Sequence, residues 1–184
     1  IYFINRVQKI VSKYDKILIG WDEVVQGEID KKSMVQQWNS ASNATLAAEK
    51  GNKIILSPAK LAYMDMKYDS TSRIGYDWAA LIEVDQAYNW NPDTINETVS
   101  PQLIYGIEAP LWTETVENMK DIEYLVFPRL LGYAEIGWSP QSVRNWGDYR
   151  TRLATYGSRF EADDIGYYRS PLVDWGKRDS IFVK

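Results

Sequence analysis

The stretch KILIGWDE, from Lys16 to Glu23, sets the pattern of the chain. It is a short apolar run without alternating polar residues, and it ends in an indole followed by two carboxylates. Such runs are typical of strands that are buried on both faces, as in a parallel sheet. We therefore predict a parallel strand here, with polar and aromatic residues at its carboxyl end.

Three further stretches follow the same plan. They are Ser33 to Asn39 (SMVQQWN), Lys53 to Ser57 (KIILS), which Pro58 interrupts and Leu61 to Asp65 (LAYMD) continues, and Ile104 to Glu114.

Helical patterns lie between these strands. Ala41 to Lys50 is built from good helix formers and stops at Gly51, a common position for a left-handed C-cap. Strands that alternate with helices predict an α/β fold, as in a parallel barrel or a doubly wound sheet. The other expected helices cover the beginning of the chain, Trp78 to Ala87 as a short helix or helical insertion, Ile122 to Trp138, and Asn145 to Glu161.

The charge and hydropathy of the chain exclude two kinds of partner. Lys plus Arg number 21 and Asp plus Glu number 25, which gives a net charge of −4, without long runs of one sign. Nucleic-acid binding needs clustered basic residues, so no nucleic-acid partner is expected. No apolar stretch approaches the roughly 20 residues of a membrane-spanning helix, so no membrane partner is expected.

The chain contains no cysteine and no histidine. It therefore lacks thiolate ligands, a cysteine nucleophile, the commonest zinc ligand and the histidine base of a serine or cysteine triad. We expect neither a metal nor a cofactor, and any proton transfer is left to carboxylates, Tyr, Lys and Arg. Aromatic residues with a polar edge are abundant instead, with 8 Trp and 13 Tyr against 4 Phe.

Aromatic and polar side chains recur together at the strand ends. In a β/α barrel these ends converge on the face that holds the active site. A pyranose rests its apolar face on an aromatic ring while its hydroxyls donate to carboxylates, so this combination favours a carbohydrate site. The groups are Trp21-Asp22-Glu23, Trp38-Asn39, Tyr63-Met64-Asp65 and Trp112-Thr113-Glu114.

Each of these residues also has an ordinary structural explanation. A single Trp in a strand is more often part of the core than a ligand platform. A single carboxylate near a turn is usually a cap or a solvated group. Recurrence at successive strand ends favours the carbohydrate site, but the residues alone leave both explanations open.

Several strings resemble the last four strands of the family 20 glycoside hydrolases, the β-N-acetylhexosaminidases. They are GWDE at Gly20 to Glu23, QQWN at Gln36 to Asn39, SPAKLAYMD at Ser57 to Asp65, and GIEAPLWTE at Gly106 to Glu114. The stretch EYLVFPRLLGYAEIGWSP at Glu123 to Pro140 is similar to the family's segment after the eighth strand. The resemblance implies the C-terminal half, strands five to eight, of a (β/α)8 TIM barrel. It implies a partial catalytic domain over residues 1–162 and a C-terminal tail or linker over residues 163–184.

The resemblance also implies an activity. Members of the family hydrolyse terminal β-linked N-acetylglucosamine or N-acetylgalactosamine with retention, using the substrate's own acetamido oxygen as nucleophile. Tyr63 matches the tyrosine that hydrogen-bonds this oxygen, and it is our candidate catalytic residue. Asp65 and Glu114 match acceptors for the outer hydroxyls of the terminal sugar. The candidate walls of the sugar pocket are Trp21, Trp38 and Trp112, with Trp78 as a further wall residue in a variable loop.

The chain departs from the family pattern at the catalytic pair. The family's adjacent Asp-Glu lies in a His-x-Gly-Gly-Asp-Glu string at the end of the fourth strand, and no such string is present here. Asp22 and Glu23 are adjacent but belong to the fifth-strand motif, where hydrogen bonding at the barrel rim is the ordinary role. Glu108 is left open between a structural carboxylate and a site residue. We expect the fragment alone to be inactive and to have the N-terminal half of the same barrel as its partner.

Two other functions stay open. A non-catalytic carbohydrate-binding barrel would keep the aromatic platforms without hydrolysis. A purely structural segment would bind nothing, because half of the pocket is absent. For the enzyme and for the binder, the expected ligands are glycans that contain N-acetylhexosamine. By family resemblance alone, we expect an exported protein, whether periplasmic, secreted or lysosomal.

Overall fold

The computed structural model describes residues 1–176. The chain divides into two compact units. The first unit consists of Ile1–Tyr63 and Trp90–Pro110, and the second consists of Met64–Asn89 and the chain from Leu111 onward. Each unit has its own architecture.

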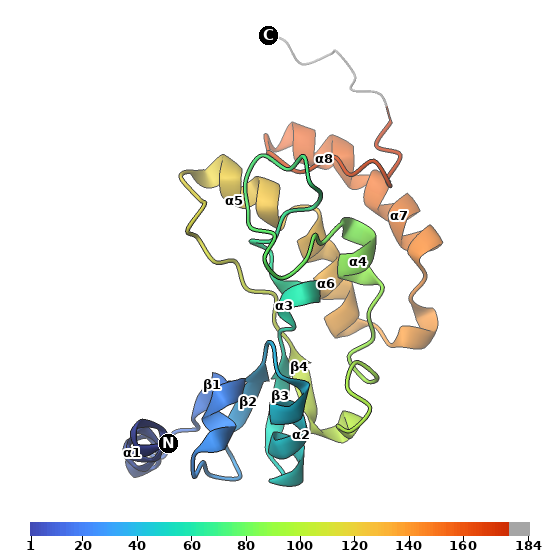
Figure 1. The fold of residues 1–184 in the computed structure, drawn as a ribbon. Coiled ribbons are helices and arrows are strands. Elements are labelled where there is room, and N and C mark those ends of the chain that lie inside the picture. Colours follow the sequence, from blue (N-terminus) through green and yellow to red (C-terminus); the bar gives the residue numbers. More distant parts are fainter. Residues whose placement is uncertain (177–184) are drawn as a thin grey trace. The chain divides into compact units, whose positions relative to one another are not determined.

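The first unit is built on a parallel sheet. Four strands lie side by side in chain order, and every neighbouring pair is parallel (Figure 1). The predicted α/β fold with a parallel sheet is therefore confirmed. The strands are β1 (Ile19–Trp21), β2 (Met34–Gln37), β3 (Lys53–Leu56) and β4 (Ile104–Ile107).

Helices connect these strands. The helix α2 packs against β2 and β3, and Gly51 follows its end with φ +77°, as the C-cap prediction requires. The expected continuation of the third strand through Leu61 to Asp65 is wrong, because Pro58 begins a helical turn, α3, in its place. The helices of this unit are α1 (Tyr2–Lys13), η1 (Asp22–Gln26), α2 (Ala41–Glu49), α3 (Ala59–Ala62) and η2 (Pro101–Leu103).

The second unit is helical. The apolar stretch Ile122 to Trp138 forms two helices, because Pro128 has no N–H to donate and keeps Phe127 extended. The stretch Asn145 to Glu161 likewise divides at Thr155. Trp78 lies outside the only helix formed near Trp78 to Ala87, which is α4. The helices are α4 (Val84–Tyr88), α5 (Met119–Val126), α6 (Arg129–Trp138), η3 (Gln141–Val143), α7 (Trp146–Ala154) and α8 (Tyr156–Ala162).

Stacked tyrosines form the centre of this second unit. Tyr68 and Tyr168 stack with ring centroids 3.9 Å apart, and Tyr88 and Tyr149 stack at 4.0 Å. Tyr168 lies after the last helix, so the chain beyond α8 contributes to this core. Residues 177–184, the end of the expected tail or linker, lie outside the described residues, and the boundary at residue 162 stays a prediction.

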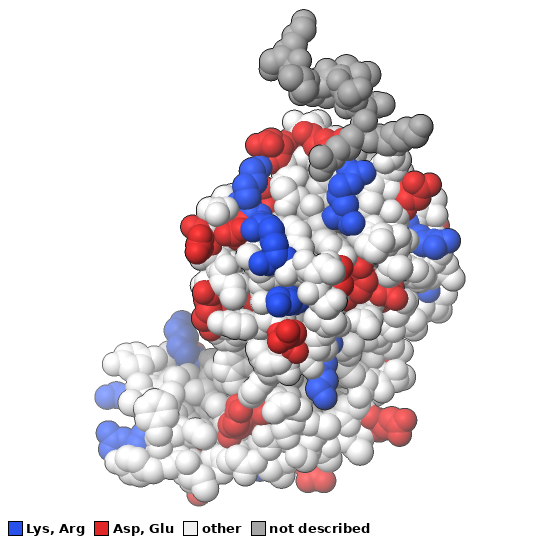
Figure 2. Space-filling model, turned by 45° about the horizontal axis from the view of Figure 1, so that its top comes forward, with Lys and Arg blue, Asp and Glu red and all other residues white. Residues whose placement is uncertain are grey.

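The surface carries charges of both signs. On the face shown in Figure 2, Lys and Arg side chains are interspersed with Asp and Glu side chains. Within residues 1–176, no helix combines the length and the apolar character that crossing a membrane demands.

Gly75 has a constrained backbone conformation in the loop that carries Asp65. Its φ is +100°, and a Cβ atom there would lie 2.8 Å from the carbonyl oxygen of Asp65. The neighbouring residue pairs with the same segment: Tyr76 N–H donates to the Asp65 carbonyl at 2.8 Å, and its own carbonyl accepts from Lys67 N–H at 2.7 Å. Any side chain at position 75 therefore strains this pairing.

We expect Gly75→Ala to lower the free energy of unfolding by about 1–3 kcal/mol, because alanine meets both an unfavourable φ and a backbone clash. Thermal denaturation of the 184-residue chain measures the change. Gly106→Ala is the control, since a Cβ there meets no atom within 4 Å. Equal stabilities of the two variants would show that the loop is not packed as described.

Candidate functional site

Three predicted site residues form an aromatic group in the first unit. The Trp38 ring stacks on Tyr63 with centroids 6.4 Å apart and planes at 15°, and the Trp21 ring meets Tyr63 edge-on at 6.5 Å. Tyr63 is buried, whereas both tryptophans are half-buried. The structure therefore brings these three residues together, with the indoles beside the phenol.

Local structure explains why the two indoles occupy these positions. Trp21 is the last residue of β1, and Trp38 directly follows β2, so parallel pairing places both at one edge of the sheet. The indole N–H of Trp38 donates to Oε1 of Glu23 at 3.1 Å, which restricts the orientation of this ring.

The carboxylate of Asp22 serves the backbone. Its Oδ2 atom accepts from the N–H groups of Trp38, Asn39 and Ser40 at 2.9–3.3 Å, and its Oδ1 atom accepts from the side-chain amide of Asn43 at 3.1 Å. Asp22 is fully buried, so these bonds compensate its desolvation. The Asp22-Glu23 pair therefore has the hydrogen-bonding role that is ordinary for this motif.

Glu108, which the sequence left open, belongs to a polar chain across three strand ends. The amide nitrogen of Gln36 donates to Oε1 of Glu108 at 2.8 Å and to the Ser57 hydroxyl at 2.9 Å. Gln36 and Ser57 are buried, but Glu108 is exposed within this chain. The sequence signal for these polar residues is that each lies near the carboxyl end of a strand.

Asp65 is the buried member of the candidate residues in the second unit. It is 2% exposed, yet its Oδ1 atom has no hydrogen-bond partner among the described residues. Buried carboxylate oxygens are nearly always paired, because desolvation without a partner is costly. This oxygen therefore keeps its capacity to accept a hydrogen bond.

The surroundings of Asp65 shift its acidity. Burial raises the pKa of its carboxyl above the usual value, although hydrogen bonds from the backbone N–H groups of Asp65 and Trp112 oppose the shift. The carboxylate of Glu114 raises this pKa further, and the guanidinium of Arg129 lowers it. Asp65, Trp112 and Glu114 thus lie near one another.

The remaining candidates of this unit are exposed, unlike Asp65. Trp112 is 40% exposed and Trp78 is 57% exposed, and Glu114 is exposed as well. Trp78 lies in the loop between Tyr76 and α4. Its assignment as a wall residue stays a prediction. The structure thus brings Trp21, Trp38 and Tyr63 together in the first unit. In the second unit it brings Asp65, Trp112 and Glu114 together.

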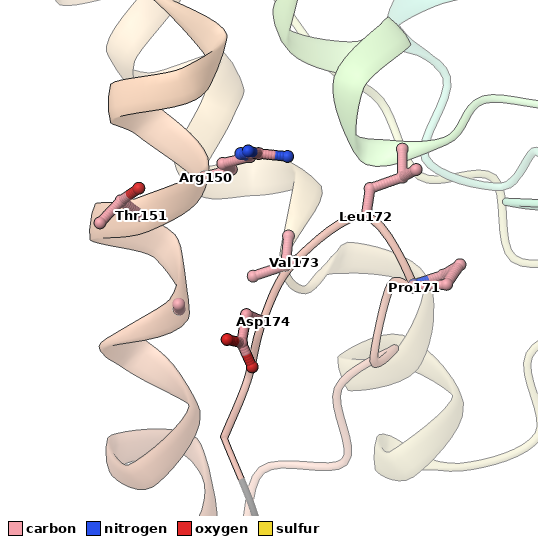
Figure 3. Close-up of a pocket in the computed structure, with 7 residues that line it drawn as sticks. Arg150, Thr151, Pro171, Leu172, Val173 and Asp174 are labelled. Atoms are coloured by element: carbon pink, nitrogen blue, oxygen red, sulfur yellow. The ribbon is translucent and has the colours of Figure 1, made fainter.

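A separate cavity of about 640 Å³ lies elsewhere in the second unit. One wall is α7, and the other is the segment of residues 171–174 (Figure 3). No predicted site residue lines it. Its lining residues are Arg150, Thr151, Ala154, Pro171, Leu172, Val173 and Asp174.

The site residues offer no metal cage. In the part of the chain that the structure describes, no group of three or more Asp and Glu residues is arranged to hold a metal ion. The two groups offer aromatic rings, a phenol and carboxylate acceptors.

Comparison with known proteins connects these residues to one family. Residues 1–141 match the family model described as glycosyl hydrolase family 20, catalytic domain. A β-N-acetylhexosaminidase from Cellulomonas fimi is 32% identical over 169 residues, which cover 90% of this chain and 34% of that protein.

Solved structures agree in fold and sequence. The family 20 β-N-acetylhexosaminidase from Streptomyces coelicolor superimposes with a TM-score of 0.90 at 40% identity, over 95% of this chain and 37% of that one. A mutant β-hexosaminidase from Streptomyces plicatus, in complex with its product GlcNAc, gives the same TM-score and identity over 95% and 36% of the two chains. The chain thus spans about a third of the length of these relatives. Between 90% and 95% of the chain aligns with them. The chain belongs to glycosyl hydrolase family 20.

Proposed function

We propose that this chain is the C-terminal half, strands five to eight, of the catalytic barrel of a β-N-acetylhexosaminidase. The complete protein that contains it would remove terminal β-linked N-acetylglucosamine or N-acetylgalactosamine from glycans by substrate-assisted retention. The chain would supply part of the wall around the terminal sugar. Its span of about a third of the relatives' length, within a family 20 match, supports this placement.

The buried, unpartnered oxygen of Asp65 is the observation that carries the proposal. A sugar hydroxyl would donate to it, and the carboxylate of Glu114 nearby offers a second acceptor. Buried carboxylate oxygens are usually paired, and a sugar hydroxyl would compensate the desolvation of this one.

The aromatic group suits the acetamido end of the sugar. Indoles of Trp21 and Trp38 beside the phenol of Tyr63 offer apolar walls with a single hydroxyl donor among them. Tyr63 would donate to the acetamido oxygen and hold it toward the anomeric carbon, which saves orientational entropy in the bond-forming step. Trp112 and Trp78 would add walls from the second unit.

The acid that protonates the leaving oxygen is proposed to lie outside this chain. The 184 residues hold no His-x-Gly-Gly-Asp-Glu string, and Asp22 is occupied by four donors. The N-terminal half of the barrel would therefore be the partner that completes the site. The domain boundary proposed at residue 162 separates this barrel segment from the C-terminal stretch.

An activity assay tests the proposal. The complete protein is expected to hydrolyse an aryl N-acetyl-β-glucosaminide, and the 184-residue chain alone is expected to show no turnover, because it lacks the acid. Turnover by the chain alone at the rate of the complete protein would show that the catalytic acid does not lie outside this chain. A complete protein that binds N-acetylglucosamine but hydrolyses nothing would instead be a sugar-binding protein.

Tyr63→Phe tests the catalytic candidate. Loss of one positioned donor should lower kcat of the complete protein on the order of 100-fold, with a much smaller change in KM, because orientation matters most in the transition state. Steady-state kinetics with the aryl glycoside measures both constants. Tyr156→Phe, which removes a hydroxyl from α8, is the control and should leave kcat unchanged. An unaltered kcat in Tyr63→Phe would remove this residue from the mechanism.

The raised pKa of Asp65 predicts opposite pH effects on binding and on stability. Sugar hydroxyls donate to the ionised form, so affinity for N-acetylglucosamine should fall as the pH falls through the raised pKa. Folding favours the protonated form, so the contribution of Asp65 to stability is present below its ordinary pKa and is lost as the pH rises through the raised value.

Calorimetric titration and thermal melts of the complete protein over a pH series check both signs. In Asp65→Asn, the affinity should fall roughly 10- to 100-fold at neutral pH, as expected for loss of a charged hydrogen bond. The part of each pH dependence that belongs to Asp65 should vanish in this variant. Unchanged pH profiles would mean that Asp65 does not receive the sugar.

A further inference from the structure

Arg129 is a fully buried cation in the second unit. It is 0% exposed, and among the described residues it makes no ion pair with a carboxylate. A buried guanidinium is costly unless its donors are satisfied. Its hydrogen-bond partners therefore indicate which part of the structure the buried side chain stabilises.

Those partners are backbone carbonyls on both sides of Asp65. One terminal nitrogen of Arg129 donates to the Met64 carbonyl at 2.6 Å, and the other donates to the Met66 carbonyl at 2.9 Å. The two residues that flank Asp65 are thus held by a single planar group. Because the guanidinium fork is rigid, it fixes the spacing and direction of the Met64 and Met66 carbonyls, which lie before and after Asp65 along the chain.

The same guanidinium is itself held in place. It donates to the carbonyls of Ile82 at 3.2 Å and Leu125 at 2.7 Å, and its carbon atom lies 3.8 Å from the centroid of the Tyr68 ring. The Leu125 carbonyl belongs to the last turn of α5, where the helix leaves its acceptors unpaired. Arg129 thereby ties the Asp65 segment to the helical part of the unit.

We infer that Arg129 is the positioning residue for Asp65, acting through the carbonyls of Met64 and Met66 to aim the buried carboxylate at the hydroxyls of the bound sugar. The inference rests on the proposed function. Its positive charge also favours the ionised carboxylate, which is the form that accepts from a hydroxyl. Lysine keeps the charge but cannot hold two carbonyls in one plane, so the two side chains are not equivalent here.

A double-mutant cycle tests this inference in the complete protein. Arg129→Lys should raise the Kd for N-acetylglucosamine roughly tenfold, and it should add at most a factor of two when Asp65→Asn is already present. A merely structural role would weaken binding by the same factor in both backgrounds. Calorimetric titration gives the four Kd values, and thermal melts verify that each variant is folded.

Arg144→Lys is the matched control. Arg144 also donates to a backbone carbonyl, that of Tyr88 at 3.2 Å, and lies 5.7 Å from a tyrosine ring in the same unit. This substitution should change the Kd less than twofold, with or without Asp65→Asn. Analogues of N-acetylglucosamine that lack one outer hydroxyl each provide a second readout. At least one of them should lose less affinity in Arg129→Lys than the parent sugar does.

If Arg129→Lys does not fold, Tyr68→Leu performs the same test. It removes the ring over the guanidinium and leaves Arg129 in the chain, whereas Tyr68→Phe keeps that ring. The effect of Tyr68→Leu on the Kd should be non-additive with that of Asp65→Asn. The effect of Tyr68→Phe should be additive with it. Additive losses for Arg129→Lys, or for Tyr68→Leu, would overturn the inference. Absence of any binding by the unmutated complete protein would contradict the proposed function first, and the inference with it.

Discussion

Parallel pairing of four short strands is the constraint on which the first unit depends. It brings the carboxyl ends of β1, β2, β3 and β4 to one edge of the sheet, because all four strands run in the same direction. Trp21, Gln36, Trp38 and Glu108 lie at or near those ends, although up to 87 positions separate them in the sequence. A one-residue slip of β2 would turn Gln36 away from Glu108 and move Val35 out of the core.

The two buried aspartates differ in how their carboxylate oxygens are paired. Asp22 accepts from three backbone N–H groups and one side-chain amide, which leaves little capacity for a ligand. Asp65 is equally hidden from solvent but keeps one oxygen without a partner among the described residues. Burial alone therefore does not separate the two residues, whereas the pairing of their oxygens does. The sugar contact that we propose for Asp65 rests on this difference.

Much of this organisation could be predicted from local patterns. The apolar runs located all four strands, and Gly51 marked the end of α2, because strand burial and left-handed C-caps leave direct signatures. Pro128 could also have placed the break between α5 and α6 inside an apolar stretch. Aromatic and acidic residues also recur at the strand ends, and the sugar site that this pattern favours stays a proposal.

Other features depend on contacts between distant segments and leave no local signal. Arg129 sits in the string FPRLLG, where an arginine would ordinarily be solvated, and its four carbonyl partners come from three separate segments. The stacking of Tyr168 on Tyr68 joins residues 100 positions apart. Each of these cases depends on which segments meet after folding.

A crystal structure of the complete protein with bound N-acetylglucosamine tests the central claim most directly. We expect the sugar to rest against Trp21, Trp38 and Trp112, with Tyr63 on its acetamido oxygen and Asp65 and Glu114 on its outer hydroxyls. A sugar bound elsewhere, or these side chains divided between opposite edges of the sheet, would contradict the account.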